Sequence, residues 1–218
     1  MNILAIADIH GAVSQVRTVL AREEQFDLVL IAGDLTHCGT SADAEAVLAP
    51  LLAAGKPLFA VPGNMDPPGA TAALEACGVS LHGRGRRLGD LGLMGAGGSG
   101  VSPFGTPFEL ADNETSRLLE AGWNRIASSL RKILVCHAPP SRTELDRGFL
   151  GKHIGSPVIR AFLETHALDL VVCGHVHESP GEDVLNGARC VNVGPLKQGR
   201  YCLIELAEGL IKVRGRKL

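Results

Sequence analysis

Short runs of apolar residues recur along this chain, and stretches with helical spacing separate most of them. Nearly continuous apolar runs of this length are typical of strands that are covered on both faces. They occupy residues 2–7, 27–33, 57–61, 131–136 and 168–173. Helices are predicted between them at 12–23, 41–54, 68–76, 112–129 and 156–166. The alternation of strand and helix predicts a layered α/β architecture.

The pattern changes after Val79, where apolar runs follow one another without helices between them. Short glycine-containing turns separate these runs, which favours antiparallel hairpins. They lie at 79–82, 86–89, 91–95, 189–193, 200–206 and 209–213. We therefore expect two sheets packed together. Residues 95–108 carry five glycines and two prolines, and this composition predicts a mobile loop near a site.

Composition limits what this chain can be. With 218 residues, 45% of them hydrophobic and 20% charged, it can bury a sizeable core as one domain over 1–218, and disordered or fibrous classes are excluded. No apolar run is long enough to span a membrane. The start, MNILAIADIH, lacks the basic segment of an export signal. Six cysteines form no CxxC pair, so free thiols and a cytoplasmic location are expected.

Polar residues of metal-binding type follow each of the five predicted central strands. In α/β sheets, sites form beyond the carboxyl ends of the strands, so we expect these residues to meet although they are far apart in sequence. A lone histidine or a lone Gly-Asp is usually structural, but donors after every central strand favour a single site. The residues are Asp8, His10, Asp34, Asn64, His137, His175 and His177.

This donor set indicates the kind of metal. Four histidines, two aspartates and one asparagine are too many ligands for one tetrahedral zinc ion, and they include no thiolate. They suit two divalent first-row ions such as manganese, iron or zinc, with one carboxylate bridging. Two dications outweigh two aspartates in charge, and the excess would attract an anionic phosphate.

The motifs D-x-H, GD, GN-x-D, H and GH-x-H, in this order from Asp8 to His177, resemble those of the calcineurin-like metallophosphoesterase superfamily. The resemblance implies a four-layer sandwich of two mixed β-sheets flanked by helices, in a single domain. It also implies that one metal is held by Asp8, His10, Asp34 and His177. The second is implied to be held by Asp34, Asn64, His137 and His175, with Asp34 as the bridge.

The resemblance implies hydrolysis of a phosphate ester by a hydroxide that bridges two metals. Asp34 and Asn64 are its expected catalytic ligands, and Asp66 is expected to orient the Asn64 loop from behind. Many family members have histidine where this chain has Met65, and methionine cannot protonate a leaving group. The GN-Met-D form resembles a branch associated with phosphodiesterase activity, so diesters with acidic leaving groups are the expected substrates.

Other residues are candidates for contact with the substrate. His37 follows Asp34 by three positions and could reach the phosphate, and Arg142 and Lys152 could hold a second group of the substrate. A small phosphodiester or nucleotide-like partner is expected. Net charge is −2 with few aromatic residues, so nucleic acid is a less favoured partner.

Two alternative functions and the oligomeric state stay open at this point. A nuclease would be favoured if the basic clusters at 84–87 and 212–217 formed one stripe. A non-catalytic scaffold that binds a protein is disfavoured because all seven ligands are retained. A homo-oligomer could form through exposed hairpin edges.

Overall fold

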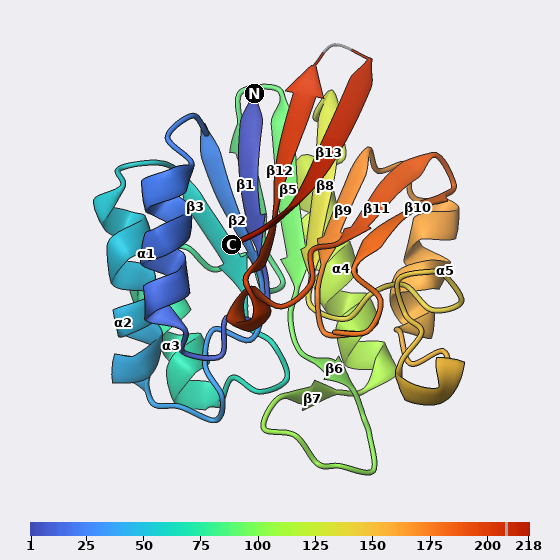
Figure 1. Ribbon diagram of the computed structural model, residues 1–218. Coiled ribbons are helices and arrows are strands. Elements are labelled where there is room, and N and C mark those ends of the chain that lie inside the picture. The colour runs from blue at the N-terminus through green and yellow to red at the C-terminus, as the bar shows by residue number, and fades with distance from the viewer. Residues whose placement is uncertain (208) are drawn as a thin grey trace.

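A computed structural model describes residues 1–207 and 209–218 and shows two large sheets packed face to face (Figure 1). The first sheet has the strand order β13-β12-β1-β2-β3. Strands β1 to β3 are parallel to one another, whereas β12 runs antiparallel to β1 and forms a hairpin with β13. The bounds are β1 Asn2–Ile6, β2 Leu28–Ala32, β3 Leu58–Val61, β12 Arg200–Ala207 and β13 Leu210–Lys217.

The second sheet has the strand order β10-β11-β9-β8-β5-β4. Its four central strands are parallel, and the edge strands β4 and β10 each return antiparallel to a neighbour. The bounds are β4 Gly85–Leu88, β5 Leu91–Ala96, β8 Arg131–Cys136, β9 Leu170–Cys173, β10 Gly181–Leu185 and β11 Ala188–Asn192.

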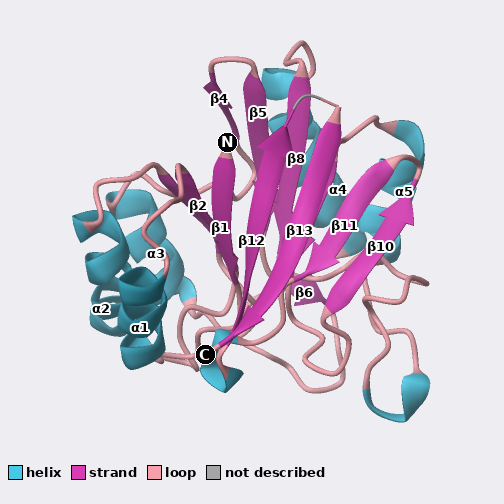
Figure 2. Ribbon diagram, turned by 45° about the horizontal axis from the view of Figure 1, so that its top comes forward, coloured by secondary structure: helices cyan, strands magenta, loops and turns pink. Residues whose placement is uncertain are grey.

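Helices cover the outer face of each sheet, which completes four layers (Figure 2). Helices α1 to α3 pack on the first sheet, and α4 and α5 pack on the second. None of the helices in the described residues combines the length and apolar character needed to cross a membrane. The bounds are α1 Val13–Arg22, α2 Ser41–Ala53, α3 Pro68–Ala76, α4 Asp112–Ile126 and α5 Pro157–Thr165.

The burial of β1 on both faces explains its unbroken apolar sequence. Ile3 and Ala5 face the core between the two sheets. Leu4 and Ile6 face the core beneath the helices. Because successive side chains of a strand point to opposite faces, both sets must be apolar. The predicted α/β sandwich of two mixed sheets is confirmed.

The expectation of antiparallel hairpins is only partly correct. The runs at 91–95 and 189–193 form central strands that pair in parallel with β8 and β9. The run at 79–82 forms only isolated bridges. The three hairpins found among residues 1–207 and 209–218 are divided between the two sheets, and β12–β13 joins the first sheet beside β1. Pairing partners distant in sequence decide this placement, and local turn signals do not report them.

The glycine-rich loop at 95–108 has more structure than its composition suggests. Strands β6 (Ser99–Gly100) and β7 (Glu109–Leu110) pair at its base. The Glu109 carboxylate accepts hydrogen bonds from the backbone and hydroxyl groups of Ser102 and Thr106. These bonds lower the pKa of Glu109 to about 2. A single carboxylate therefore organises the segment that was expected to be mobile.

Candidate metal centre

The carboxyl ends of β1, β2 and β3 in one sheet and of β8 and β9 in the other lie at the same end of the sandwich (Figure 1). The seven predicted donors follow these strands and meet across the gap between the sheets. Asn64, beyond β3, contacts His137, beyond β8, and His175, beyond β9. The cluster therefore draws on both sheets.

The backbone is strained where these donors leave the strands. Asp8, His10, Asp34 and His175 have φ angles of 50°, 48°, 51° and 69°. This left-handed region is uncommon for residues with a side chain and costs on the order of 1–3 kcal/mol at each position. The turns are held in place by hydrogen bonds between the strand ends, such as Asp8 N–H to Gly33 C=O at 3.0 Å. Strain of this kind concentrates at functional sites.

The glycines of the GN and GH motifs leave room for the carboxylates. A Cβ atom on Gly63 would lie 2.0 Å from Oδ1 of Asp34. A Cβ atom on Gly174 would lie 2.5 Å from Oδ2 of Asp8. Neither distance is compatible with a side chain, so these two motifs need glycine because the backbone passes directly against a candidate ligand.

One group of donors gathers around Asp8. His177 Nε2 lies 3.3 Å from Asp8 Oδ1, and Asp8 also accepts the backbone N–H of His175 at 3.0 Å. His10 Nε2 lies 3.6 Å from Asp34 Oδ2. Ligand atoms of Asp8, His10 and His177 lie within 4.8 Å of one another. This spacing would allow one cation to be held among them.

A second group gathers around Asn64. Its Oδ1 atom lies 2.8 Å from His137 Nε2 and 3.0 Å from His175 Nδ1. His137 Nε2 is also 3.5 Å from Asp34 Oδ1. Asp34 thus presents Oδ2 to the first group and Oδ1 to the second, as a bridging carboxylate would.

The chemistry of the donors fits a cation at this place. His137 Nδ1 contacts the Ala32 carbonyl oxygen at 2.9 Å, so this nitrogen must donate. In a neutral imidazole, Nε2 then carries a free lone pair, which points toward the Asn64 amide at 2.8 Å and Asp34 Oδ1 at 3.5 Å. A positive ion among His137 Nε2, Asn64 and Asp34 would take up these lone pairs, so the donor set fits a cation.

Burial changes the pKa of several donors. It raises the pKa of Asp34 to about 7, and the carboxylates of Asp8 and Asp66 act in the same direction. It lowers the pKa of His10 to about 4 and that of His175 to about 3. These two imidazoles are therefore neutral, which is the form that binds metal.

At the remaining donors, contacts with neighbouring side chains shift the pKa in the direction opposite to burial. Burial alone would raise the pKa of Asp8, but the His177 hydrogen bond and the nearby imidazoles lower it. The hydrogen bond to Asp8 raises the pKa of His177. Burial would lower the pKa of His137, yet the charges of Asp34 and Asp8 raise it overall. Shifts in opposite directions within one cluster are typical of functional sites.

Asp66 lies behind the donors and links two of their loops. Its carboxylate accepts the backbone N–H groups of Leu35 at 3.0 Å, Thr36 at 2.8 Å and Gly63 at 2.9 Å. It also accepts the Thr36 hydroxyl at 2.9 Å. Leu35 and Thr36 directly follow Asp34, and Gly63 directly precedes Asn64. The geometry therefore supports the predicted role of Asp66 in orienting the Asn64 loop.

A pocket of about 530 Å³ opens beside the donors. His37 lines it, and the His37 and His10 rings have centroids 5.3 Å apart. Met65 lines it as well. Arg142 and Lys152 are not among its lining residues, so their contact with a substrate stays a prediction. The full lining is His10, Asp34, His37, Asn64, Met65, His175, His177, Pro195, Lys197 and Gln198.

Sequence reasoning missed the three lining residues at 195, 197 and 198. They belong to the 3₁₀ turn η2 (Leu196–Gln198) and the residue before it. The residues from Asn192 to Pro195 form the turn that joins β11 to η2. Asn192 holds this turn in place, because its amide donates to the Leu145 and Val176 carbonyls and its Oδ1 accepts Gly194 N–H.

Comparisons with known proteins identify the family. Residues 1–179 match the sequence profile of the family described as calcineurin-like phosphoesterase. Over 200 residues, the chain is 30% identical to the uncharacterized protein MJ1162 of Methanocaldococcus jannaschii, covering 89% of this chain and 88% of that protein. This chain belongs to the calcineurin-like phosphoesterase family.

Solved structures share its fold. Protein TT1561 of Thermus thermophilus superposes with a TM-score of 0.78 at 22% identity, covering 98% of this chain and 97% of that one. A dimetal phosphatase from Danio rerio superposes with a TM-score of 0.70 at 12% identity, covering 100% and 96%. At these identities the similarity establishes the architecture alone.

Proposed function

We propose that this chain is a dinuclear, metal-dependent phosphoesterase that hydrolyses a phosphodiester or a nucleotide-like phosphate ester. The observation that carries the proposal is the convergence of seven oxygen and nitrogen donors from both sheets beside an open pocket. Family membership supplies the reaction class, and the donor set supports the metal dependence. Hydrolysis of a small anionic substrate suits a pocket of this size.

Two divalent ions of manganese, iron or zinc would occupy the two groups of donors. Asp8, His10 and His177 would hold one, and Asn64, His137 and His175 the other, with Asp34 shared. Bound there, the ions would activate a water molecule and neutralise charge on the phosphate. The protein's own part is to fix the donors by strained turns and by the hydrogen bonds of Asp66.

The residue at position 65 bears on the type of ester. Met65 lines the pocket, and its backbone N–H donates to Asp34 Oδ1 at 2.8 Å. Its thioether cannot give a proton to a departing alkoxide. Esters whose leaving groups are acidic need no such proton, and this favours activated phosphodiesters over alkyl monoesters.

His37 is the candidate to contact the phosphate from the pocket wall. Its ring packs edge to face against His10. His37 therefore lies beside the proposed metal ligands but is not one of them. In His37→Ala, the rate of diester hydrolysis should fall by about tenfold. This loss is smaller than the full rate contribution of a positioned general acid. An unchanged rate and pH profile would remove His37 from the reaction.

The arrangement of the basic residues argues against the nuclease alternative. The basic cluster at 84–87 lies on and just before β4, at one edge of the second sheet, next to β5. The cluster at 212–217 lies on β13, at the far edge of the first sheet, over β10 and β11. The two clusters therefore do not form one stripe along which a polynucleotide could lie.

The proposal extends to domain organisation, location and oligomeric state. A single domain over 1–218 is supported by sheets that draw strands from both ends of the chain. A cytoplasmic location is supported by six cysteines that are all free. A homo-oligomer through strand edges stays a prediction, and the lysine and arginine residues of β13 oppose it, because charged edges resist pairing.

Metal analysis coupled to an activity panel tests the proposal. The protein should bind about two equivalents of Mn²⁺, Fe²⁺ or Zn²⁺ and hydrolyse bis-p-nitrophenyl phosphate. The panel should also contain phosphomonoesters, cyclic nucleotides, dinucleotides and single-stranded nucleic acid. A protein that is loaded with two metals and leaves every phosphate ester intact would contradict the proposed function.

A further inference from the structure

One cationic side chain lines the pocket and is not a proposed metal ligand. Lys197 lies in η2, which begins a few residues after β11 ends. Among the pocket-lining residues in the described part of the chain, it is the only one with an ammonium or guanidinium group. A phosphate ester is an anion, so a cation at this place bears on its binding.

The backbone of η2 is tied to the end of β1. Leu196 N–H donates to the Ala7 carbonyl at 2.9 Å, and Lys197 N–H donates to the Asp8 carbonyl at 3.2 Å. The Leu196 side chain is fully buried in the core beneath the first sheet's helices. The main chain of Lys197 is therefore fixed against a candidate metal ligand, which is how a positioned binding residue is built.

The Lys197 side chain is not used within the fold. It is exposed, and no carboxylate of residues 1–207 and 209–218 forms an ion pair with it. Lys212, by contrast, lies 3.9 Å from Glu205. Asp34, the one carboxylate that lines the pocket within the described chain, is buried among the metal donors. An ammonium group with three donors and no carboxylate partner is available for an anionic ligand.

We propose that Lys197 binds a non-bridging oxygen of the substrate's phosphoryl group and is the main side-chain cation in that contact. The inference rests on the proposed function, because it assumes that the phosphate enters this pocket. The contact would hold the phosphoryl group in both the bound substrate and the transition state. Met65, on the same pocket, offers neither a charge nor a donor, so Lys197 supplies an interaction that position 65 lacks.

Lys197→Ala, Lys197→Arg and the control Lys56→Ala test the proposal. Lys56 is an exposed lysine outside the pocket. In Lys197→Ala, kcat/KM for bis-p-nitrophenyl phosphate should fall by about 10- to 100-fold, the usual loss of one charged hydrogen bond, mainly through KM. Lys197→Arg should keep activity within about fivefold of the parent, because the charge and donors remain. Lys56→Ala should match the parent.

A binding measurement separates this role from a general defect. Isothermal titration of the metal-loaded protein with inorganic phosphate should show a Kd raised about 10- to 100-fold in Lys197→Ala. Bound metal and thermal unfolding should stay unchanged. Unchanged phosphate affinity in Lys197→Ala would overturn the inference while leaving the proposed function intact. Loss of metal or of folding in both Lys197→Ala and Lys197→Gln would also overturn it, since the role would then be structural. Failure of the parent protein on every ester would overturn the proposed function first.

Discussion

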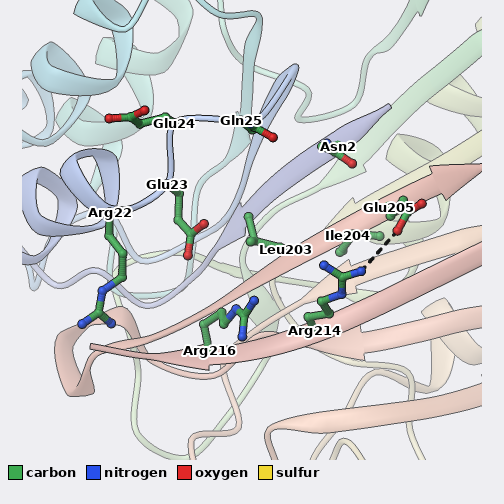
Figure 3. A pocket seen from close by; sticks show the side chains of 10 residues that line it. All are labelled: Asn2, Arg22, Glu23, Glu24, Gln25, Leu203, Ile204, Glu205, Arg214 and Arg216. Atoms are coloured by element: carbon green, nitrogen blue, oxygen red, sulfur yellow. Dashed lines mark ion pairs between the residues drawn. The ribbon is translucent and has the colours of Figure 1, made fainter.

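Two pockets of this protein differ in a way that separates a site from a surface groove. The second pocket, of about 410 Å³, lies between the end of α1 and the outer face of β12 and β13 (Figure 3). It contains more charged side chains than the pocket at the candidate metal centre, and four of its six charged side chains, Arg22, Glu23, Glu205 and Arg214, have partners. Arg214 lies 3.5 Å from Glu205, Arg22 donates to the Lys217 carbonyl at 3.0 Å, and Glu23 accepts the Tyr201 hydroxyl at 2.7 Å.

The polar atoms at the candidate metal centre are arranged differently. Imidazole, amide and carboxylate groups converge at His137, Asn64 and Asp34, and a buried nitrogen of His10 has no hydrogen-bond partner among the described residues. The backbone differs too, because left-handed residues cluster at the centre and none of those in the described chain lines the second pocket. Converging ligand-type side chains on a strained backbone, and not the number of charges, therefore distinguish the candidate metal centre from the second pocket.

The largest effect is expected from Asp34→Asn. The amide keeps the shape of the side chain but removes the charge that both groups of donors share, so bound metal should fall below two equivalents. Hydrolysis of bis-p-nitrophenyl phosphate should fall by about 10³-fold or more. Elemental analysis and steady-state kinetics measure both. Glu205→Gln in the second pocket is the matched control, and equal losses in the two variants would erase the distinction between the pockets.

A smaller change is expected from Met65→His. An imidazole facing the pocket would supply the missing proton donor, so monoesterase turnover should rise relative to diesterase turnover by about tenfold or more. Parallel assays with p-nitrophenyl phosphate and bis-p-nitrophenyl phosphate give the ratio. Met65→Leu controls for the change of shape. An unchanged ratio would mean that position 65 does not face the leaving group.

Acid should destabilise the segment that follows β8. Asp146 is fully buried, and it accepts the N–H groups of Arg142, Thr143 and Gly155 and contacts His153 Nδ1 at 2.6 Å. Burial would raise its pKa, but these hydrogen bonds lower it overall. A lowered pKa contributes stability above the unfolded value, near pH 4, and that stability is lost as the pH falls through the folded value.

The substitution Asp146→Asn tests this dependence. The free energy of unfolding at pH 7 should fall by about 1–3 kcal/mol, because one charged acceptor of several hydrogen bonds is lost. Urea titrations between pH 7 and pH 3 should show that the parent loses this extra free energy of unfolding as the pH falls, whereas the variant has none to lose. A constant difference across that range would contradict the assignment.

The smallest effect is expected in the second pocket. Arg214 and Glu205 are both exposed by more than a third, and exposed ion pairs contribute about 0–1 kcal/mol. Arg214→Ala should therefore change the unfolding free energy by less than about 1 kcal/mol and leave hydrolysis unchanged. Loss of activity in this variant would show that the second pocket is coupled to the first.

The order of strands and donors could be predicted from the sequence because both depend on local chemistry. Buried strands need apolar residues on both faces, so β1, β2, β3, β8 and β9 are visible as apolar runs, and each run ends at a candidate ligand. β10 was not predicted, because most of its residues are exposed and its sequence, Gly181 to Leu185, lacks the apolar pattern of a central strand.

Sequence by itself determined which side chains can bind a cation here, since residue type fixes the donor atoms and strand ends fix where they emerge. Only the tertiary structure decided that Lys197 lines the pocket beside these side chains while Arg142 and Lys152 do not line it. The physical reason is that pairing between distant strands and backbone hydrogen bonds such as Lys197 N–H to Asp8 C=O set these positions. No local pattern of residues encodes them.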